Sequence, residues 1–195
     1  MKLAFLRCIL GLFAVGAAVS ADEEPWYVTK FGEKLTTAGG AMATTRKFLD
    51  GKMIGVYFAA SWNATCLAFM PTLAKFHSEA KRKYDFEIVF VSRDRSEEDM
   101  IDHMNRKCAM PWFAVPFDSP RRAELMKEFN GLPRLIIFDK DGKLLSNNAR
   151  WDVSLLGAKA VLRWRSANYK PLTYLDAGKR YDRKHPKKGS KKHSR

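Results

Sequence analysis

Two short segments of the chain are continuously apolar, and polar residues bound each of them. They are Met53–Ala59, which follows the turn-forming sequence DGK, and Phe86–Ser92. A continuous apolar run of this length between polar turns predicts a strand that is buried on both faces. A third apolar segment, RLIIF, is followed by DKDG and KLL, which predicts a β-hairpin whose turn is centred on Asp141 and Gly142.

Apolar residues at helical spacing separate these strands. Residues 66–84 carry Leu, Met, Ala and Phe at intervals of three or four positions, and Pro71 among them predicts a kink. A serine three positions before an acidic residue predicts a helix that starts near residue 96, and further helices are predicted over 121–129 and 152–165. This order of elements predicts an α/β fold with helices flanking a central mixed sheet.

The two ends of the chain differ from this central region. Residues 1–21 place Lys2 and Arg7 before an apolar stretch that ends in small residues, which is typical of a secretory signal peptide. An uncleaved membrane anchor and a mitochondrial presequence are the alternatives, although the apolar stretch is shorter than the ~20 residues that span a bilayer. We therefore divide the chain into a signal peptide at 1–21, a folded domain at 22–165, and a linker with a disordered basic tail at 166–195.

Positive charge is concentrated at the C-terminus. Residues 176–195 hold nine Lys or Arg and two Asp, which is a net charge of +7 out of +14 for the whole chain. Such a segment favours binding to a polyanion, whether an acidic protein, an anionic lipid or a nucleic acid, and the alternative is a purely solubilising tail.

The sequence AASWNATCLAFMP, directly after the first buried strand, carries the candidate chemistry. A helix N-terminus lowers the pKa of a cysteine because its free N–H groups stabilise the thiolate, so Cys66 is a candidate for thiol chemistry. Asn63 stands where a second cysteine would complete a Cys-x-x-Cys motif. Asn63 also begins the only Asn-x-Ser/Thr sequon of the chain, so it is a candidate for N-glycosylation in a secreted protein, or simply for the helix N-cap.

This segment resembles the active-site region of thioredoxin-fold proteins, and specifically of the tryparedoxin and nucleoredoxin branch. Trp62 and Pro71 match that branch, Cys66 aligns with its second, resolving cysteine, and Pro133 with its active-site cis-proline. The likeness extends over roughly residues 48–152. It implies a thioredoxin-like fold, and thiol–disulfide oxidoreductase activity in members that have both cysteines.

The departures from that branch concern its chemistry. Asn63 replaces the attacking cysteine, Ala-Thr at 64–65 replaces Pro-Pro, and Arg134 follows the proline where the branch has threonine. Without the attacking thiol, the two-cysteine cycle cannot run at this motif. The residues expected to shape the site are Trp62, Asn63, Trp112, Pro133 and Arg134.

We therefore expect a redox-impaired module of the secretory pathway, in the lumen of the endoplasmic reticulum or secreted, that binds a protein client or thiol partner. A second possible function is a residual monothiol oxidoreductase that uses Cys66, alone or with Cys108 as its second cysteine. A third is an assembly protein whose tail binds a polyanion. For Cys66 itself, the alternatives to a monothiol role are an internal disulfide with Cys108 and an inert core thiol. We expect a monomer without cofactor or metal, with His77 and His103 at the surface.

Overall fold

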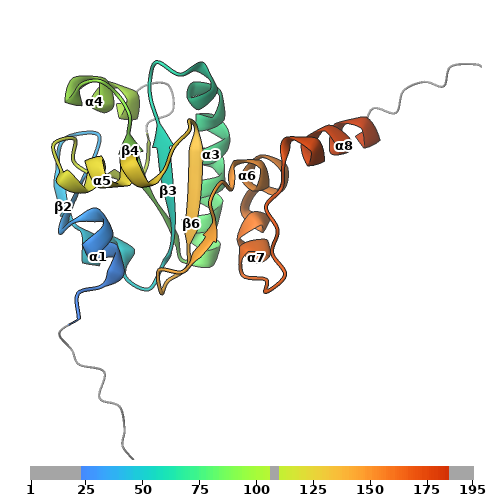
Figure 1. Cartoon of the computed structure of the whole chain (residues 1–195), viewed down its shortest axis with the longest axis horizontal. Coiled ribbons are helices and arrows are strands. Elements are labelled where there is room, and N and C mark those ends of the chain that lie inside the picture. The colour runs from blue at the N-terminus through green and yellow to red at the C-terminus, as the bar shows by residue number, and fades with distance from the viewer. Residues whose placement is uncertain (1–22, 106–109, 185–195) are drawn as a thin grey trace, which may run out of the picture.

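The computed structural model describes residues 23–105 and 110–184, which form a seven-stranded mixed sheet between helices (Figure 1). The strand order is β2-β1-β5-β4-β3-β6-β7. Strands β3 and β4 are parallel, as are β4 and β5, whereas β6 is antiparallel to β3. The strands are β1 (Lys34–Thr36), β2 (Met42–Thr44), β3 (Met53–Ala59), β4 (Phe86–Ser92), β5 (Phe113–Ala114), β6 (Arg134–Phe138) and β7 (Leu144–Ser146).

Helices cover both faces of this sheet. The helices are α1 (Trp26–Phe31), α2 (Thr45–Leu49), α3 (Ala64–Tyr84), α4 (Glu97–Asn105), α5 (Pro120–Glu128), α6 (Arg150–Leu156), the 3-10 turn η1 (Gly157–Lys159), α7 (Ala160–Trp164) and α8 (Tyr174–Lys184). One apolar cluster joins the sheet to α3, α4, α6 and α7, and a second joins it to α1, α2 and α5. In Figure 1, α3 and α1 accordingly lie on opposite sides of the central strands.

The central strand β3 shows why its sequence is continuously apolar. Tyr57 and Ala59 belong to the cluster under α3, whereas Val56 and Phe58 belong to the cluster under α1 and α5. Successive side chains of a strand point to opposite faces, so a strand between two helical layers buries all of them. The predicted α/β fold with a mixed sheet flanked by helices is confirmed, and β3 and β4 have the predicted bounds.

Two regions differ from the prediction. The helix predicted over 152–165 is interrupted by η1, where Gly157 has a φ of +54° that ends α6. The lead-in before β3, which has no clear periodicity, forms α1, β1, β2 and α2. Strands β1 and β2 have three residues each, which is too short for a two-residue alternation to be recognised.

The C-terminal region requires a further correction. The sequence predicts a linker with a disordered basic tail over 166–195, yet Tyr174–Lys184 form α8, which extends away from the sheet beyond α6 (Figure 1). Ring contact between Trp151 and Tyr174, with centroids 5.6 Å apart, attaches the start of α8 to α6. The expected signal peptide at 1–21 and residues 185–195 lie outside the described residues. No helix within residues 23–105 or 110–184 is long and apolar enough to cross a membrane.

Candidate functional site

The candidate site lies where β3 ends and α3 begins. Asn63 is the N-cap of α3: its backbone is extended, and its side-chain Oδ1 accepts a hydrogen bond from the backbone N–H of Cys66 at 3.1 Å. The first N–H groups of a helix have no partner within the helix, and an N-cap side chain satisfies one of them. Asn63 therefore has a defined structural role at the position that the resemblance assigns to a cysteine.

Cys66 lies in the first turn of α3 and is fully buried, with 0% of its surface exposed. Its thiol has no disulfide partner within residues 23–105 and 110–184, and the Tyr57 hydroxyl donates a hydrogen bond to its backbone carbonyl at 3.4 Å. Burial raises the pKa of the Cys66 thiol and outweighs a hydrogen bond from the backbone of Ala60, which lowers it; the charges of Asp94 and Arg150 have smaller, opposite effects. The thiolate, which is the reacting form, is thus disfavoured, and its sulfur has no open path to a large substrate.

The two tryptophans expected at the site have different environments. Trp62 is 56% exposed in the loop before α3, and its indole N–H donates to the Arg93 carbonyl at 3.4 Å. Trp112 is only 2% exposed and packs edge-on against Tyr57 and His77. Trp112 therefore supports the site from within the core and does not line a surface groove, whereas Trp62 is available to a partner.

Pro133 and Arg134 lie beside the end of β3. The Leu132–Pro133 peptide bond is cis, Pro133 is buried, and Arg134 is the strand partner of Phe58. The Arg134 guanidinium donates a 2.8 Å hydrogen bond to the Asn147 carbonyl and a second bond to the Asn130 carbonyl. The half-buried guanidinium thus ties the loop before β6 to the turn after β7.

A buried carboxylate that sequence reasoning missed anchors the site from β4. Asp94 Oδ1 accepts a 2.6 Å hydrogen bond from the Ser61 N–H, and Oδ2 accepts one of 2.7 Å from the Ser92 hydroxyl and lies 3.1 Å from His103 Nδ1. Burial alone would raise the pKa of Asp94, but the hydrogen bonds from His103, Ser61 and Ser92 outweigh it and lower that pKa. Asp94 therefore holds the loop that carries Trp62.

A second buried carboxylate, Glu87, lies at the other end of β4. His77 Nε2 of α3 is 2.5 Å from Glu87 Oε1, and Lys81 Nζ is 2.9 Å from Glu87 Oε2. His77 and His103 are each 2% exposed, so the expectation that both are surface residues is wrong. The single acidic residue of the strand FEIVFVS was a signal for such a pair, because a carboxylate in a buried strand needs a partner. Residues 23–105 and 110–184 contain no group of three His, Cys, Asp or Glu side chains arranged for a metal.

Two sequence-based hypotheses on this site stay predictions. Cys108 lies in residues 106–109, outside the described part of the chain, so its pairing with Cys66 is not placed. Asn63, the first residue of the sequon, is half-buried, and its Oδ1 is used in the helix cap. N-glycosylation there would use the other atom of the same amide, Nδ2.

Comparison with known proteins shows which family this chain is similar to. A family model described as thioredoxin-like matches residues 51–144. A probable nucleoredoxin 1 of Arabidopsis thaliana is 43% identical over 115 residues, which cover 57% of this chain and 19% of that protein. The nucleoredoxin of Danio rerio is 33% identical over 153 residues, 75% of this chain and 36% of that protein. The chain thus spans about a fifth to a third of these relatives.

The similarity extends over almost the whole length of solved structures of related proteins. A thioredoxin from Wuchereria bancrofti superposes with a TM-score of 0.58 and 35% identity, over 66% of this chain and 90% of that one. A tryparedoxin from Trypanosoma brucei superposes with a TM-score of 0.61 and 30% identity, over 72% of this chain and 96% of that one.

Proposed function

This chain belongs to the thioredoxin-like family, within its nucleoredoxin and tryparedoxin branch, and from that premise we propose that it is a redox-impaired member that binds a protein client or partner. The observation that carries the proposal is the pair Asn63 and Cys66. An asparagine, not a thiol, caps α3 three residues before a cysteine that is fully buried.

Thiol–disulfide exchange requires a thiolate that a substrate disulfide can reach. In this chain the Cys66 thiol is buried and its pKa is raised, so both requirements fail together. The same two facts argue against the alternative of a monothiol oxidoreductase at Cys66, and they favour its role as a core residue under α3.

A partner surface is supported by two exposed apolar side chains at the same end of α3. Trp62 is 56% exposed and Leu67, in the second turn of the helix, is 42% exposed. Single exposed apolar residues are common, but aromatic residues held by a rigid loop are typical anchors of protein interfaces. Trp62 is held in this way, because Asp94 fixes the preceding residue, Ser61.

The redox part of the proposal is tested by restoring the missing thiol. Asn63→Cys should acquire dithiol-dependent reduction of insulin and an internal disulfide with Cys66, visible as a mass loss of about two hydrogen atoms on oxidation. The wild type and the matched control Asn63→Ser, which keeps a capping hydroxyl, should show no turnover above the dithiol background. Wild-type turnover comparable to that of Asn63→Cys would refute redox impairment.

The alternative at Cys66 has its own test. Any residual transfer to a small disulfide by the wild type should be unchanged in Cys66→Ser. A loss of that transfer in Cys66→Ser would establish the monothiol oxidoreductase instead.

The binding part has a separate measurement. Suppression of the aggregation of reduced insulin B chain should weaken in Trp62→Ala and Leu67→Ser. Leu144→Ser is the control, because Leu144 is 48% exposed on β7. Equal behaviour of the three variants would remove the surface around Trp62 from the proposal.

We also propose entry into the secretory pathway, which is supported by the signal-like pattern of residues 1–21. Expression of the full chain in a secretory host should release protein that begins after Ser20 or Ala21, as read from its intact mass. Retention of the full-length chain inside the cell would contradict this proposal.

A further inference from the structure

Helix α8 exposes a stripe of one apolar and two basic residues, here called the α8 stripe: Leu175, Lys179 and Arg183. Residues four apart lie on one face of a helix, and all three are exposed. Leu175 is 70% exposed and its neighbour Tyr174 is 71% exposed, the two highest values among the exposed large hydrophobic residues of the described chain.

The inner side of α8 is already in use, which leaves the α8 stripe facing outward. Tyr174 contacts the Trp151 ring, and the Arg180 guanidinium donates to the Leu155 carbonyl of α6. Asp176 caps the start of the helix by accepting hydrogen bonds from the N–H and hydroxyl of Thr173, each 2.8 Å long. The helix is thus held on one side and formed before any partner is bound.

We propose that the α8 stripe docks on the surface of an anionic lipid bilayer. A helix that combines Lys and Arg with exposed apolar side chains suits the boundary between lipid headgroups and acyl chains, where Tyr is also favoured. A nucleic acid would satisfy the cations but would leave Leu175 in water, and an acidic protein would need an apolar groove beside its negative charge. A bilayer supplies negative charge and an apolar layer together, so it is the partner that the stripe favours.

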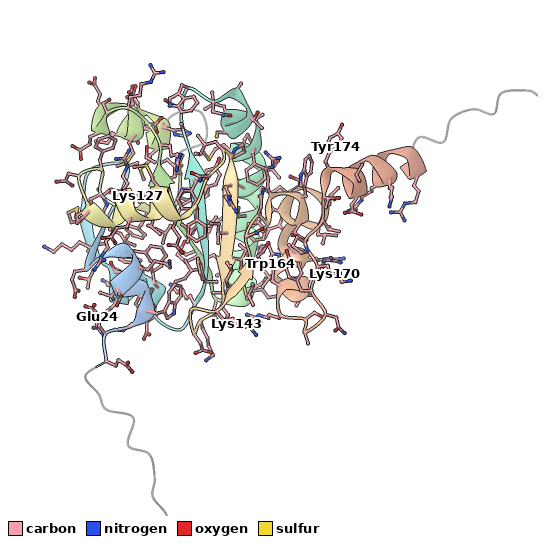
Figure 2. The ribbon with its side chains drawn as sticks, in the orientation of Figure 1. Glu24, Lys127, Lys143, Trp164, Lys170 and Tyr174 are labelled. Carbon is pink, nitrogen blue, oxygen red and sulfur yellow. The ribbon has the colours of Figure 1, made fainter. Side chains whose placement is uncertain are left out.

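Position and sequence agree with this assignment. Tyr174 and Glu24 lie on opposite sides of the molecule, and α8 extends beyond α6, so a flat surface reaches it without contacting the sheet (Figure 2). Residues 185–195, which follow α8 in the sequence, contain five further Lys or Arg and no acidic residue. Each Lys or Arg near an anionic membrane surface strengthens binding roughly fivefold.

The test is flotation of the full chain with lipid vesicles. The wild type should bind vesicles with about one third phosphatidylglycerol but not pure phosphatidylcholine, and should be released progressively above about 0.15 M salt. Lys179→Glu/Arg183→Glu should weaken binding at least ~20-fold, because two cations are lost. Leu175→Ser should weaken it severalfold without changing the net charge.

The matched control is Lys34→Glu/Lys127→Glu, which makes the same change of net charge at two exposed residues of β1 and α5. Figure 2 shows Lys127 far from Tyr174, so this control should bind within about threefold of the wild type.

An equal loss in both double variants would assign binding to net charge and overturn the proposal. Full binding by Leu175→Ser, or binding to a DNA duplex but not to vesicles, would also overturn it. Thermal melting should confirm that all variants are folded.

Discussion

Asp94 Oδ1 accepts a 2.6 Å hydrogen bond from the backbone N–H of Ser61, and this contact ties the C-terminal end of β4 to the loop that begins α3. The same carboxylate contacts Ser92 and His103 through its other oxygen. The exposed Trp62 therefore follows a residue that is fixed by a buried carboxylate, which explains how a surface loop holds an aromatic side chain in one place.

Asp94→Asn should destabilise the protein by about 2–4 kcal/mol, because His103 and the Ser61 N–H lose a charged partner inside the core. Urea unfolding measures this loss. Glu98→Gln, at an exposed position of α4, is the control and should change stability by less than about 0.5 kcal/mol. Equal effects of the two substitutions would contradict the anchoring role of Asp94.

Acid should destabilise the protein through two buried carboxylates, Glu87 on β4 and Asp94 just after it. The pKa of Glu87 is lower than the ordinary 4.5, because bonds from His77 and Lys81 outweigh its burial, and the pKa of Asp94 is lower than the ordinary 3.8. The unfolded chain therefore binds protons more readily, and the stability present above these ordinary values is lost as the pH falls through the native values. Urea midpoints that do not change between neutral pH and pH ~3 would contradict this account.

The sheet could be predicted because burial on both faces leaves a direct mark on the sequence. Strands β3 and β4 are apolar at every position except Glu87 and the final serine, so their bounds follow from the run itself. A helix that makes most of its contacts with one neighbour, such as α8, has a weaker apolar pattern in its sequence. Its inner contacts come from Tyr174, Arg180 and their partners on α6, and none of these partners is identifiable from periodicity alone.

The candidate site was predicted in part, for a similar reason. The cap at Asn63 follows from the residue type and its place before an apolar helix, and the structure places it there. The burial of His77 and His103 was not predicted, because each depends on a carboxylate about ten positions away, on β4 or just after it, that only the fold brings close. Trp112 was expected to shape the site, but its burial was not predicted: it is 2% exposed and packs edge-on against Tyr57.

Gly55 at the centre of β3 should not tolerate a larger residue. A Cβ atom there would lie 2.8 Å from the ring of Phe86 and 3.3 Å from Leu135, so Gly55→Ala overpacks the cluster under α3 and should cost about 1–3 kcal/mol. Gly178→Ala is the matched control, because a Cβ on α8 meets nothing within 4 Å and alanine favours a helix. Urea unfolding of both variants decides this, and a stability loss at Gly178 as large as that at Gly55 would contradict the packing argument.

Replacement of the cap should show how much of the site depends on Asn63. Asn63→Ala leaves the Cys66 N–H without its side-chain partner and should cost about 0.5–2 kcal/mol. Asn63→Asp should preserve stability, since a carboxylate accepts the same bond and a negative charge is favourable at a helix N-terminus. Chemical unfolding at neutral pH compares the two, and an alanine variant as stable as the wild type would show that the cap contributes nothing.

Native Cys66 should react with iodoacetamide far more slowly than the same residue in urea, by at least ~100-fold. Its surface is 0% exposed, and burial raises the pKa of its thiol, so both the access and the thiolate fraction are small. Pulse labelling followed by mass spectrometry of the peptide that contains Cys66 measures the two rates on one protein. Asn63→Ala is a useful comparison, because a frayed first turn of α3 should expose the thiol and raise its labelling rate. Rapid labelling of native wild type at Cys66 would show an accessible thiolate, and would return the residue to the candidates for monothiol exchange.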